Sequence, residues 1–231
     1  MKGVFSFIGI ACIVLAAGCA QEQPASGAGK SAAGQTAKGS MSAAVSQVES
    51  VTPVLLDDFE GELTGGLDGT VDYGSGNGAQ VEVRASTGIK QSGAQSLEVV
   101  YDAVHDGYMW VARGFELDAS RTGWLVKHSE IDWERYNAFS FYVYGEGKGT
   151  QLAFDLKDGG NEMWRFLFKD DTAGWKQVIC PFSEFFARGD WQPDAADKNA
   201  QLDFPVKSFQ FEPRPQARGT IYFDKVELIR K

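Results

Sequence analysis

The chain has 231 residues, of which 43% are hydrophobic and 13% aromatic, so it is long enough to bury one substantial core. Its formal net charge is −9, and no basic cluster is interleaved with aromatic residues, which excludes nucleic acid as an expected partner.

The first eighteen residues are typical of a signal for export. One lysine precedes an apolar run, Val4 to Ala17, that is too short for a comfortable transmembrane helix. The end of this run, Leu-Ala-Ala-Gly-Cys, resembles a bacterial lipoprotein signal, with its leucine one place further from the cysteine than usual. We therefore expect residues 1–18 to be cleaved so that Cys19 becomes a lipidated N-terminus. The alternative is an ordinary cleaved signal that happens to contain a cysteine.

A polar segment follows this signal. Residues 19–50 are rich in Ala, Gly, Ser and Gln and contain no aromatic residue, so they cannot bury enough surface to offset their chain entropy. This composition predicts a flexible linker between a lipid anchor and a folded domain. The expected location is a bacterial membrane, at the outer membrane or the cell surface, with the lipid as the only membrane contact.

From residue 51 onward the chain reads as short strands separated by Gly-rich and Asp-rich turns. No long amphipathic helix interrupts the series, so we predict one all-β sandwich of about nine or ten strands over residues 51–231. The nine clearest segments are AQVEVRA, QSLEVVYDA, YMWVARGFEL, NAFSFYVYGEG, TQLAFDLKDG, EMWRFLFKDD, WKQVICPF, VKSFQFEP and TIYFDKVELIR.

The alternation of apolar and polar residues along these segments predicts which side chains form the core. Trp164, Phe166 and Phe168 share one strand face and are expected to be buried. Cys180 is the one cysteine of the domain, and it alternates with apolar neighbours, so it is expected to be a buried small hydrophobe. Trp110 and Trp175 stand near strand ends, and we expect both to have structural roles.

One tryptophan lies in a different setting. In the segment FFARGDWQPD, Trp191 follows Arg188 and Asp190 between glycine and proline, without strand or helix periodicity. A rigid ring at a loop tip can stack on the C–H groups of a sugar, while the charged pair binds hydroxyl groups at its edge. The alternative is a surface loop whose tryptophan folds back onto the sandwich.

Four motifs, in order, resemble the family 11 carbohydrate-binding modules. They are LLDDFEG at the start of the domain, DGYMW after the second clear strand, PFSEFFARGDWQP, and GTIYFDKVELI at the end. The resemblance covers nearly all of Val51 to Ile229. It implies a jelly-roll β-sandwich with a cleft on its concave face that binds β-linked glucans.

The resemblance also implies site residues. The positions that match the cleft of the family are Tyr73, Tyr108, Arg188, Asp190 and Trp191, with tryptophan in place of a tyrosine at the last. Two positions depart from the pattern: Glu212-Pro213 replaces a further cleft tyrosine, and Met163 replaces a histidine. Local substitutes are then expected among Arg165, Gln210 and Arg214.

The same resemblance suggests a structural calcium ion. Calcium takes oxygen ligands from separate positions of a chain. Asp58 and Glu60 near the start of the domain and Asp224 near its end would meet if the first and last strands are neighbours. The alternative is three ordinary surface acids.

Three classes of function remain at this point. A non-catalytic polysaccharide-binding lipoprotein, with a β-glucan as its partner, fits the resemblance. A protein-interaction domain of the complex I intermediate-associated protein 30 type shares the sandwich and part of the tryptophan pattern. A glycoside hydrolase would need two carboxylates facing a groove, and no motif singles out such a pair.

Overall fold

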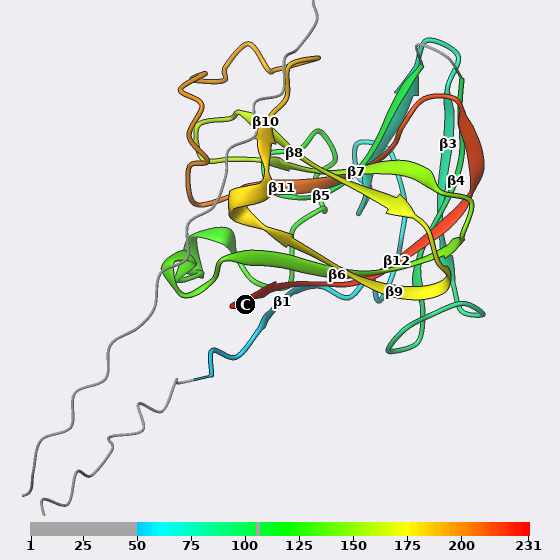
Figure 1. The fold of residues 1–231 in the computed structure, drawn as a ribbon, viewed down its shortest axis with the longest axis horizontal. Coiled ribbons are helices and arrows are strands. Elements are labelled where there is room, and N and C mark those ends of the chain that lie inside the picture. The colour runs from blue at the N-terminus through cyan, green and yellow to red at the C-terminus, as the bar shows by residue number, and fades with distance from the viewer. Residues whose placement is uncertain (1–49, 105–106) are drawn as a thin grey trace, which may run out of the picture. The chain divides into compact units, whose positions relative to one another are not determined.

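The computed structural model describes residues 50–104 and 107–231, which form two antiparallel β-sheets packed face to face (Figure 1). The first sheet, sheet A, has the order β3-β4-β12-β6-β9, and β1 also pairs with β12. Its strands are β1 (Val54–Asp57), β3 (Gln80–Ser86), β4 (Ser96–Ala103), β6 (Ala138–Glu146), β9 (Ala173–Pro181) and β12 (Ala217–Ile229).

The second sheet, sheet B, has the order β10-β8-β7-β11-β5-β2. Its strands are β2 (Asp72–Gly76), β5 (Tyr108–Gly114), β7 (Thr150–Lys157), β8 (Met163–Asp170), β10 (Phe186–Ala187) and β11 (Ser208–Pro213). Three short 3-10 helices lie in the connections: η1 (His128–Glu130), η2 (Trp133–Arg135) and η3 (Phe182–Glu184).

The predicted all-β jelly-roll sandwich is confirmed. Each of the nine expected segments contains a strand, and the described residues add three short ones, β1, β2 and β10. The first and last strands are neighbours, as the calcium hypothesis required, because β1 pairs with β12. The predictions for residues 1–18, Cys19 and the linker up to residue 49 lie outside the described residues. Within the described part of the chain, no helix has the length and apolarity to cross a membrane.

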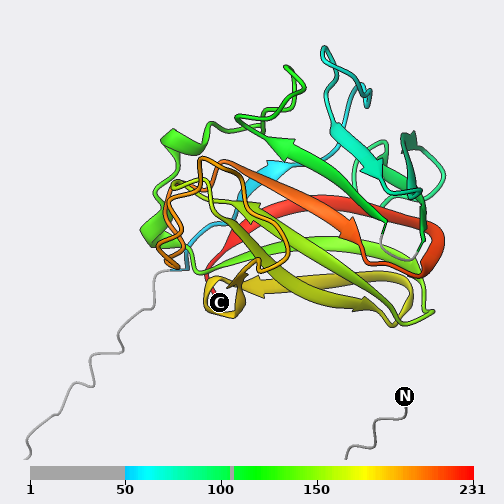
Figure 2. The same ribbon diagram turned by 90° about the horizontal axis from the view of Figure 1, so that it is seen from above.

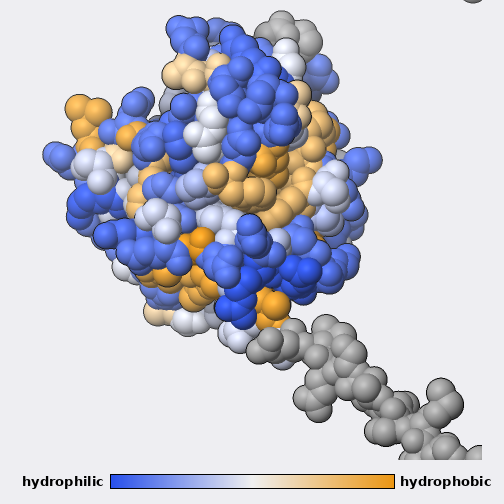
Figure 3. Space-filling model, turned by 90° about the vertical axis from the view of Figure 1, so that its left-hand side faces the viewer, coloured by the Kyte–Doolittle hydropathy of each residue, from blue (hydrophilic) through white to orange (hydrophobic). Residues whose placement is uncertain are grey.

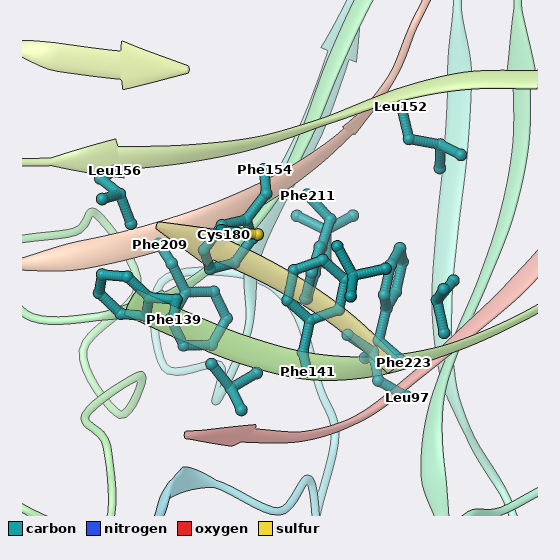
Figure 4. Packing of buried hydrophobic residues seen from close by; sticks show 14 of the residues in the cluster. Leu97, Phe139, Phe141, Leu152, Phe154, Leu156, Cys180, Phe209, Phe211 and Phe223 are labelled. Carbon is teal, nitrogen blue, oxygen red and sulfur yellow. The ribbon is translucent and has the colours of Figure 1, made fainter. Parts of the chain in front are cut away.

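The largest fully buried side chains of the core are phenylalanines that point between the sheets. Phe139 and Phe141 from β6 meet Phe154 from β7 and Phe211 from β11 (Figure 4). All four are fully buried, and Phe211 stacks on Phe223 of β12. Each ring comes from alternate positions of its strand, so the opposite positions face away from the core. Cys180 and Trp164 are buried as predicted.

A buried ion pair also joins the two sheets. Arg113 of β5 donates to Asp57 of β1 over 2.6 Å, and its guanidinium also reaches the Thr70 carbonyl. Burial raises the pKa of Asp57, against the lowering effect of the Arg113 charge and hydrogen bond. Removing either charge would leave the other one buried without a partner.

The long loop between β10 and β11 lies at the end of the sandwich opposite the β3–β4 hairpin (Figures 1 and 2). On the end that faces left in Figure 1, hydrophobic side chains are interrupted by hydrophilic ones (Figure 3). This long loop begins with Arg188, and it brings the Arg-Gly-Asp-Trp segment next to sheet B.

Candidate functional site

A cavity of about 930 Å³ lies over the outward face of sheet B. Strands β2, β5, β7 and β11 supply its floor, and the loop after β10 supplies one wall. Its lining combines aromatic with hydrogen-bonding side chains, among them Tyr108, Trp110, Lys157, Trp191, Gln210 and Arg214.

Two aromatic residues of β5 form one side of the cavity. Tyr108 and Trp110 occupy alternate positions, so they share the outward face, and their rings stack at 6.3 Å with an interplanar angle of 14°. Tyr108 is 53% exposed, whereas Trp110 is half-buried and donates its indole N–H to Asp72 over 3.0 Å. Trp110 was expected to be structural, but its ring lines the cavity.

Trp191 forms the other wall. It is 55% exposed, and the Arg188 guanidinium lies 5.8 Å from its ring centroid, within the range of a cation–π contact. The following residue, Gln192, accepts a hydrogen bond from the Met163 backbone N–H at 2.7 Å and donates to the Met163 and Arg188 carbonyls. These bonds attach the loop to β8, so the Trp191 ring is presented by an anchored segment.

A buried arginine lies beneath the floor. Arg165 of β8 donates through Nε and Nη2 to the two carboxylate oxygens of Asp155 on β7, at 2.8 and 2.7 Å. The two residues are register partners, and both point outward from sheet B beneath the cavity. Asp155 is fully buried and Arg165 nearly so, which makes this a desolvated fork-to-fork pair.

Four further charged residues extend this pair into a network. Arg188 donates to both oxygens of Asp190 at 3.0 and 3.1 Å, and to Asp155 at 3.1 Å. Glu212 accepts from Arg165 at 2.7 Å and is also paired with Arg214. The network therefore contains three arginines and three carboxylates, and its formal charges balance.

The environment shifts the pKa values of these groups. Partial burial disfavours the ionised form of Asp190, but the hydrogen bonds and charges of Arg188 and Arg165 outweigh it and hold the pKa of Asp190 well below its usual range. Burial raises the pKa of Glu212, while the charge of Arg165 opposes this rise. Burial also disfavours the charged form of Arg165, but Asp155 outweighs it and raises the pKa of the guanidinium above its ordinary value.

The structure brings together four of the five residues predicted for binding: Tyr108, Arg188, Asp190 and Trp191 all line the cavity. Tyr73 does not, and its assignment to the cavity is wrong. It pairs with buried Val111 and packs against the core, so it occupies the opposite face of β2. Arg188 also differs from expectation, because 9% of its side chain is exposed and its donors are engaged with carboxylates.

The suggested substitutes divide between the cavity and the buried layer beneath it. Gln210 and Arg214 line the cavity, whereas Arg165 lies below it. Asp155 was not predicted, although its alternation with buried Phe154 and Leu156 would have assigned it to the outward face of β7.

The three residues predicted for calcium come together only in part. Asp224 is fully buried, its Oδ1 has no hydrogen-bond partner, and Glu60 is close enough for its charge to add to the effect of burial in raising the pKa of Asp224. Asp58 is engaged locally, where it accepts the Glu60 backbone N–H at 3.1 Å. Among the described residues, no three His, Cys, Asp or Glu side chains are arranged to hold a metal ion.

A β-sandwich whose outward sheet face carries a cavity of aromatic and hydrogen-bonding side chains defines a ligand-binding module. The family model described as "Carbohydrate binding domain (family 11)" matches residues 22–231. The chain therefore belongs to family 11 of the carbohydrate-binding domains, which confirms the resemblance in the sequence.

The similar proteins include one enzyme and several separate modules. Endoglucanase H of Acetivibrio thermocellus is 29% identical over 183 residues, which cover 76% of this chain and 18% of that enzyme. The chain therefore spans less than a fifth of the length of this curated relative.

Among solved structures, a family 11 carbohydrate-binding module from Clostridium thermocellum is 26% identical with a TM-score of 0.61, over 77% of this chain and 95% of that one. It is described in complex with a β-1,3-1,4-mixed-linked tetrasaccharide. The family 11 module of the cellulase Lic26A-Cel5E from the same organism is 25% identical with a TM-score of 0.60, over 78% and 96% of the two chains.

Proposed function

We propose that this chain is a non-catalytic polysaccharide-binding protein that recognises a β-linked glucan in the cavity over sheet B. The observation that carries the proposal is the pair of exposed aromatic walls, Tyr108 and Trp191, on either side of a cavity that also has hydrogen-bonding side chains in its lining. Aromatic rings stack on the C–H faces of sugars, and hydrogen-bonding side chains suit a ligand rich in hydroxyl groups. The mixed-linked tetrasaccharide bound by the related module supports the ligand class.

The charge network favours binding over hydrolysis. A glycoside hydrolase needs one carboxyl group that donates a proton and one free carboxylate that faces the sugar. Glu212 is enclosed by Arg165 and Arg214, and Asp190 is held by Arg188 and Arg165, so both carboxylates already have cationic partners. The match covers only 18% of Endoglucanase H, so it gives no support for assigning the activity named for that enzyme to this chain.

The protein-interaction alternative has less support. An assembly domain is expected to present a contiguous apolar patch, and here the exposed rings stand over a hollow whose lining includes charged and hydrogen-bonding side chains. A groove of this kind fits a chain-like ligand better than a flat partner surface.

Calorimetry of the full-length protein with mixed-linked β-glucan oligosaccharides tests the proposal. Tyr108→Ala should weaken binding by roughly tenfold or more, because it removes an exposed stacking face. Phe186→Ala is the matched control: Phe186 is 47% exposed on the outward face of sheet B, at the edge strand β10, outside the cavity lining. Equal losses in the two variants, or no binding by the unmodified protein to any β-glucan oligosaccharide, would contradict the proposal.

We also propose that Cys19 carries a lipid that anchors the protein to a bacterial membrane. The lipobox-like run before it and the polar linker after it support this assignment. Each buried methylene contributes about 0.8 kcal/mol, so several acyl chains would hold the protein almost irreversibly. Cys19→Ser should release the protein from the membrane fraction or block its processing, and unchanged membrane partitioning would refute the anchor.

The third proposal is that Glu60 and Asp224 hold a calcium ion near the paired first and last strands. The buried Asp224 Oδ1 without a partner supports it, since a hard cation takes such an oxygen as a ligand. The ion would offset the Glu60 charge that contributes to the raised pKa of Asp224, and it would join the segment after β1 to β12.

A further inference from the structure

A second row of aromatic side chains lies on the outward face of sheet A, on the other side of the sandwich from the cavity. Tyr222 of β12, Tyr144 of β6 and Trp175 of β9 are successive register partners across three neighbouring strands. Their neighbours along each strand, including Phe223 and Val143, point into the core, so these three rings point outward. All three are half-buried. We call Tyr222, Tyr144 and Trp175 the outer aromatic row.

The rings of this row alternate in orientation. Tyr144 stands edge-on to both neighbours, at 5.7 Å and 83° from Tyr222 and at 5.5 Å and 70° from Trp175. The two outer rings are two strands apart, a distance of about 10 Å from the usual interstrand spacing. Tyr222 and Trp175 can therefore each stack on a separate sugar unit. The line that joins them crosses the strands, and the phenol ring of Tyr144 lies between them.

A smaller cavity adjoins this row. It has a volume of about 430 Å³, and its lining includes Thr220 and Glu146. Thr220 lies two positions from Tyr222 on β12, so it shares the outward face of sheet A with the row. Glu146 lies two positions from Tyr144 on β6, beyond a β-bulge at Gly145. The small cavity therefore begins one step along the strands from the row and adds hydroxyl and carboxylate groups to its lining.

The charges around the row are paired with one another. Glu98, the register partner of Tyr222, lies 3.5 Å from Arg84. Glu146 is paired with Lys148, and Arg218 lies 3.8 Å from Asp102. Glu82, which also lines the small cavity, lies 3.8 Å from the same Arg84, so acids slightly outnumber bases here. A surface without excess basic charge does not attract a phospholipid headgroup, a nucleic acid or an acidic peptide. A neutral ligand with many hydroxyl groups is complementary to this surface.

We propose that the outer aromatic row and the adjoining cavity form a second polysaccharide-binding surface, which takes a neutral, extended β-linked glycan across the strands of sheet A. Sugar units would stack on Tyr222 and Trp175, and the polar residues of the small cavity would bind hydroxyl groups. The protein would then hold two polysaccharide chains, or two parts of one chain, on opposite faces of one sandwich. The outer surface does not depend on the cavity over sheet B, so each can bind without the other.

The indole N–H signals of the tryptophans separate the two surfaces. The full-length protein, with these signals assigned through Trp→Phe variants, would be titrated with hexasaccharides of β-1,4-glucan, mixed-linked β-glucan, β-1,4-xylan and β-1,4-mannan. We expect at least one of them to shift the Trp175 signal saturably, and Trp191→Ala to leave this shift in place. Tyr222→Ala should weaken it severalfold. No response of Trp175 to any of the four would overturn the proposal.

The same spectra distinguish this proposal from the function proposed above. A shift of the Trp191 signal without one at Trp175 refutes the second surface alone, whereas the reverse refutes only the cavity over sheet B. If the Trp175 signal shifts with protein concentration in the absence of sugar, and light scattering gives the mass of a dimer, the outer aromatic row is an interface between copies and the proposal fails.

Retention in a gel that contains the polysaccharide whose oligosaccharide shifts both the Trp175 and the Trp191 signals gives a second readout. Two surfaces on one molecule raise its apparent affinity for a long polymer, so Trp175→Ala should reduce retention by about tenfold. Ile179→Ala is the matched control, because Ile179 lies on the outward face of the same strand, four positions away, outside the row. Equal reductions in both variants would mean that loss of outward apolar area, and not the aromatic row, causes the effect.

Discussion

Trp191→Ala should remove most β-glucan binding while the protein stays folded. A fully buried tryptophan removes about 200 Å² from water, so a residue that is 55% exposed removes about 90 Å². At about 25 cal/mol per Å², this burial contributes at most about 2 kcal/mol to the free energy of unfolding. A loss of this size lowers the Tm by about 4–8 °C for a domain of this length. Removal of a stacking wall should weaken binding by about 2 kcal/mol or more, which is roughly thirtyfold.

Calorimetry with a mixed-linked oligosaccharide and thermal unfolding of the same sample measure both quantities. Trp191→Phe should retain most of the affinity, since it keeps a ring in the anchored loop. Trp164→Ala provides the opposite pattern, because Trp164 is 8% exposed and its truncation should cost about 3–5 kcal/mol of stability. A Trp191→Ala protein with normal glucan affinity and a Tm as low as that of Trp164→Ala would refute the assignment of this ring to a binding wall.

Three further variants test the buried charges. Arg165→Met should lower the free energy of unfolding by about 3–5 kcal/mol, because Asp155 stays buried without its bidentate partner; urea denaturation measures this, and a loss under about 1 kcal/mol would contradict it. The pKa of Asp57 is higher in the folded protein than its ordinary value of 3.8. Its contribution to stability is therefore complete at pH values below 3.8, and it is lost as the pH rises through the pKa of the folded state. Arg113→Ala should therefore lower the Tm more near pH 7 than near pH 4, and an equal drop at both would count against the argument. Chelation should lower the Tm of the unmodified protein and have no effect after Asp224→Asn, once a slowly exchanging ion has been excluded; a Tm indifferent to chelator in the unmodified protein would refute the calcium proposal.

The strands were predictable because the core and the solvent impose a period of two on most of them. Phe139 and Phe141 indicate an inward face from the sequence alone, and the structure places both between the sheets. The same rule would have corrected the error at Tyr73, which shares a face with Val71, a fully buried residue. It would also have assigned Trp110 to the same outward face as Tyr108. The assignment of Tyr73 followed the family pattern, and that of Trp110 followed its position near a strand end. The alternation of inward and outward side chains predicts both faces correctly.

The charge network was not predictable in the same way. Asp155, Arg165 and Glu212 lie on three strands, and their meeting depends on the register between β7, β8 and β11. A shift of one residue in either pairing would turn the outward side chains of a strand toward the core. In the sequence, each of these three residues is indistinguishable from a charged residue on the solvent-exposed face of a strand. They become a buried cluster only when the three strands pair.

The network explains why departures from the family pattern need not abolish binding. Glu212 replaces an expected tyrosine, yet only 5% of its side chain is exposed, and its oxygens are held by Arg165 and Arg214. In the proposed site it would hold those arginines in place, and it also lines the cavity itself. Side chains fixed in advance lose little conformational entropy when a ligand binds, so a rigid floor supports affinity without contributing a stacking face. If the proposed function holds, the choice between glucans would fall to the exposed rings Tyr108 and Trp191 and to polar groups of the lining such as Gln210.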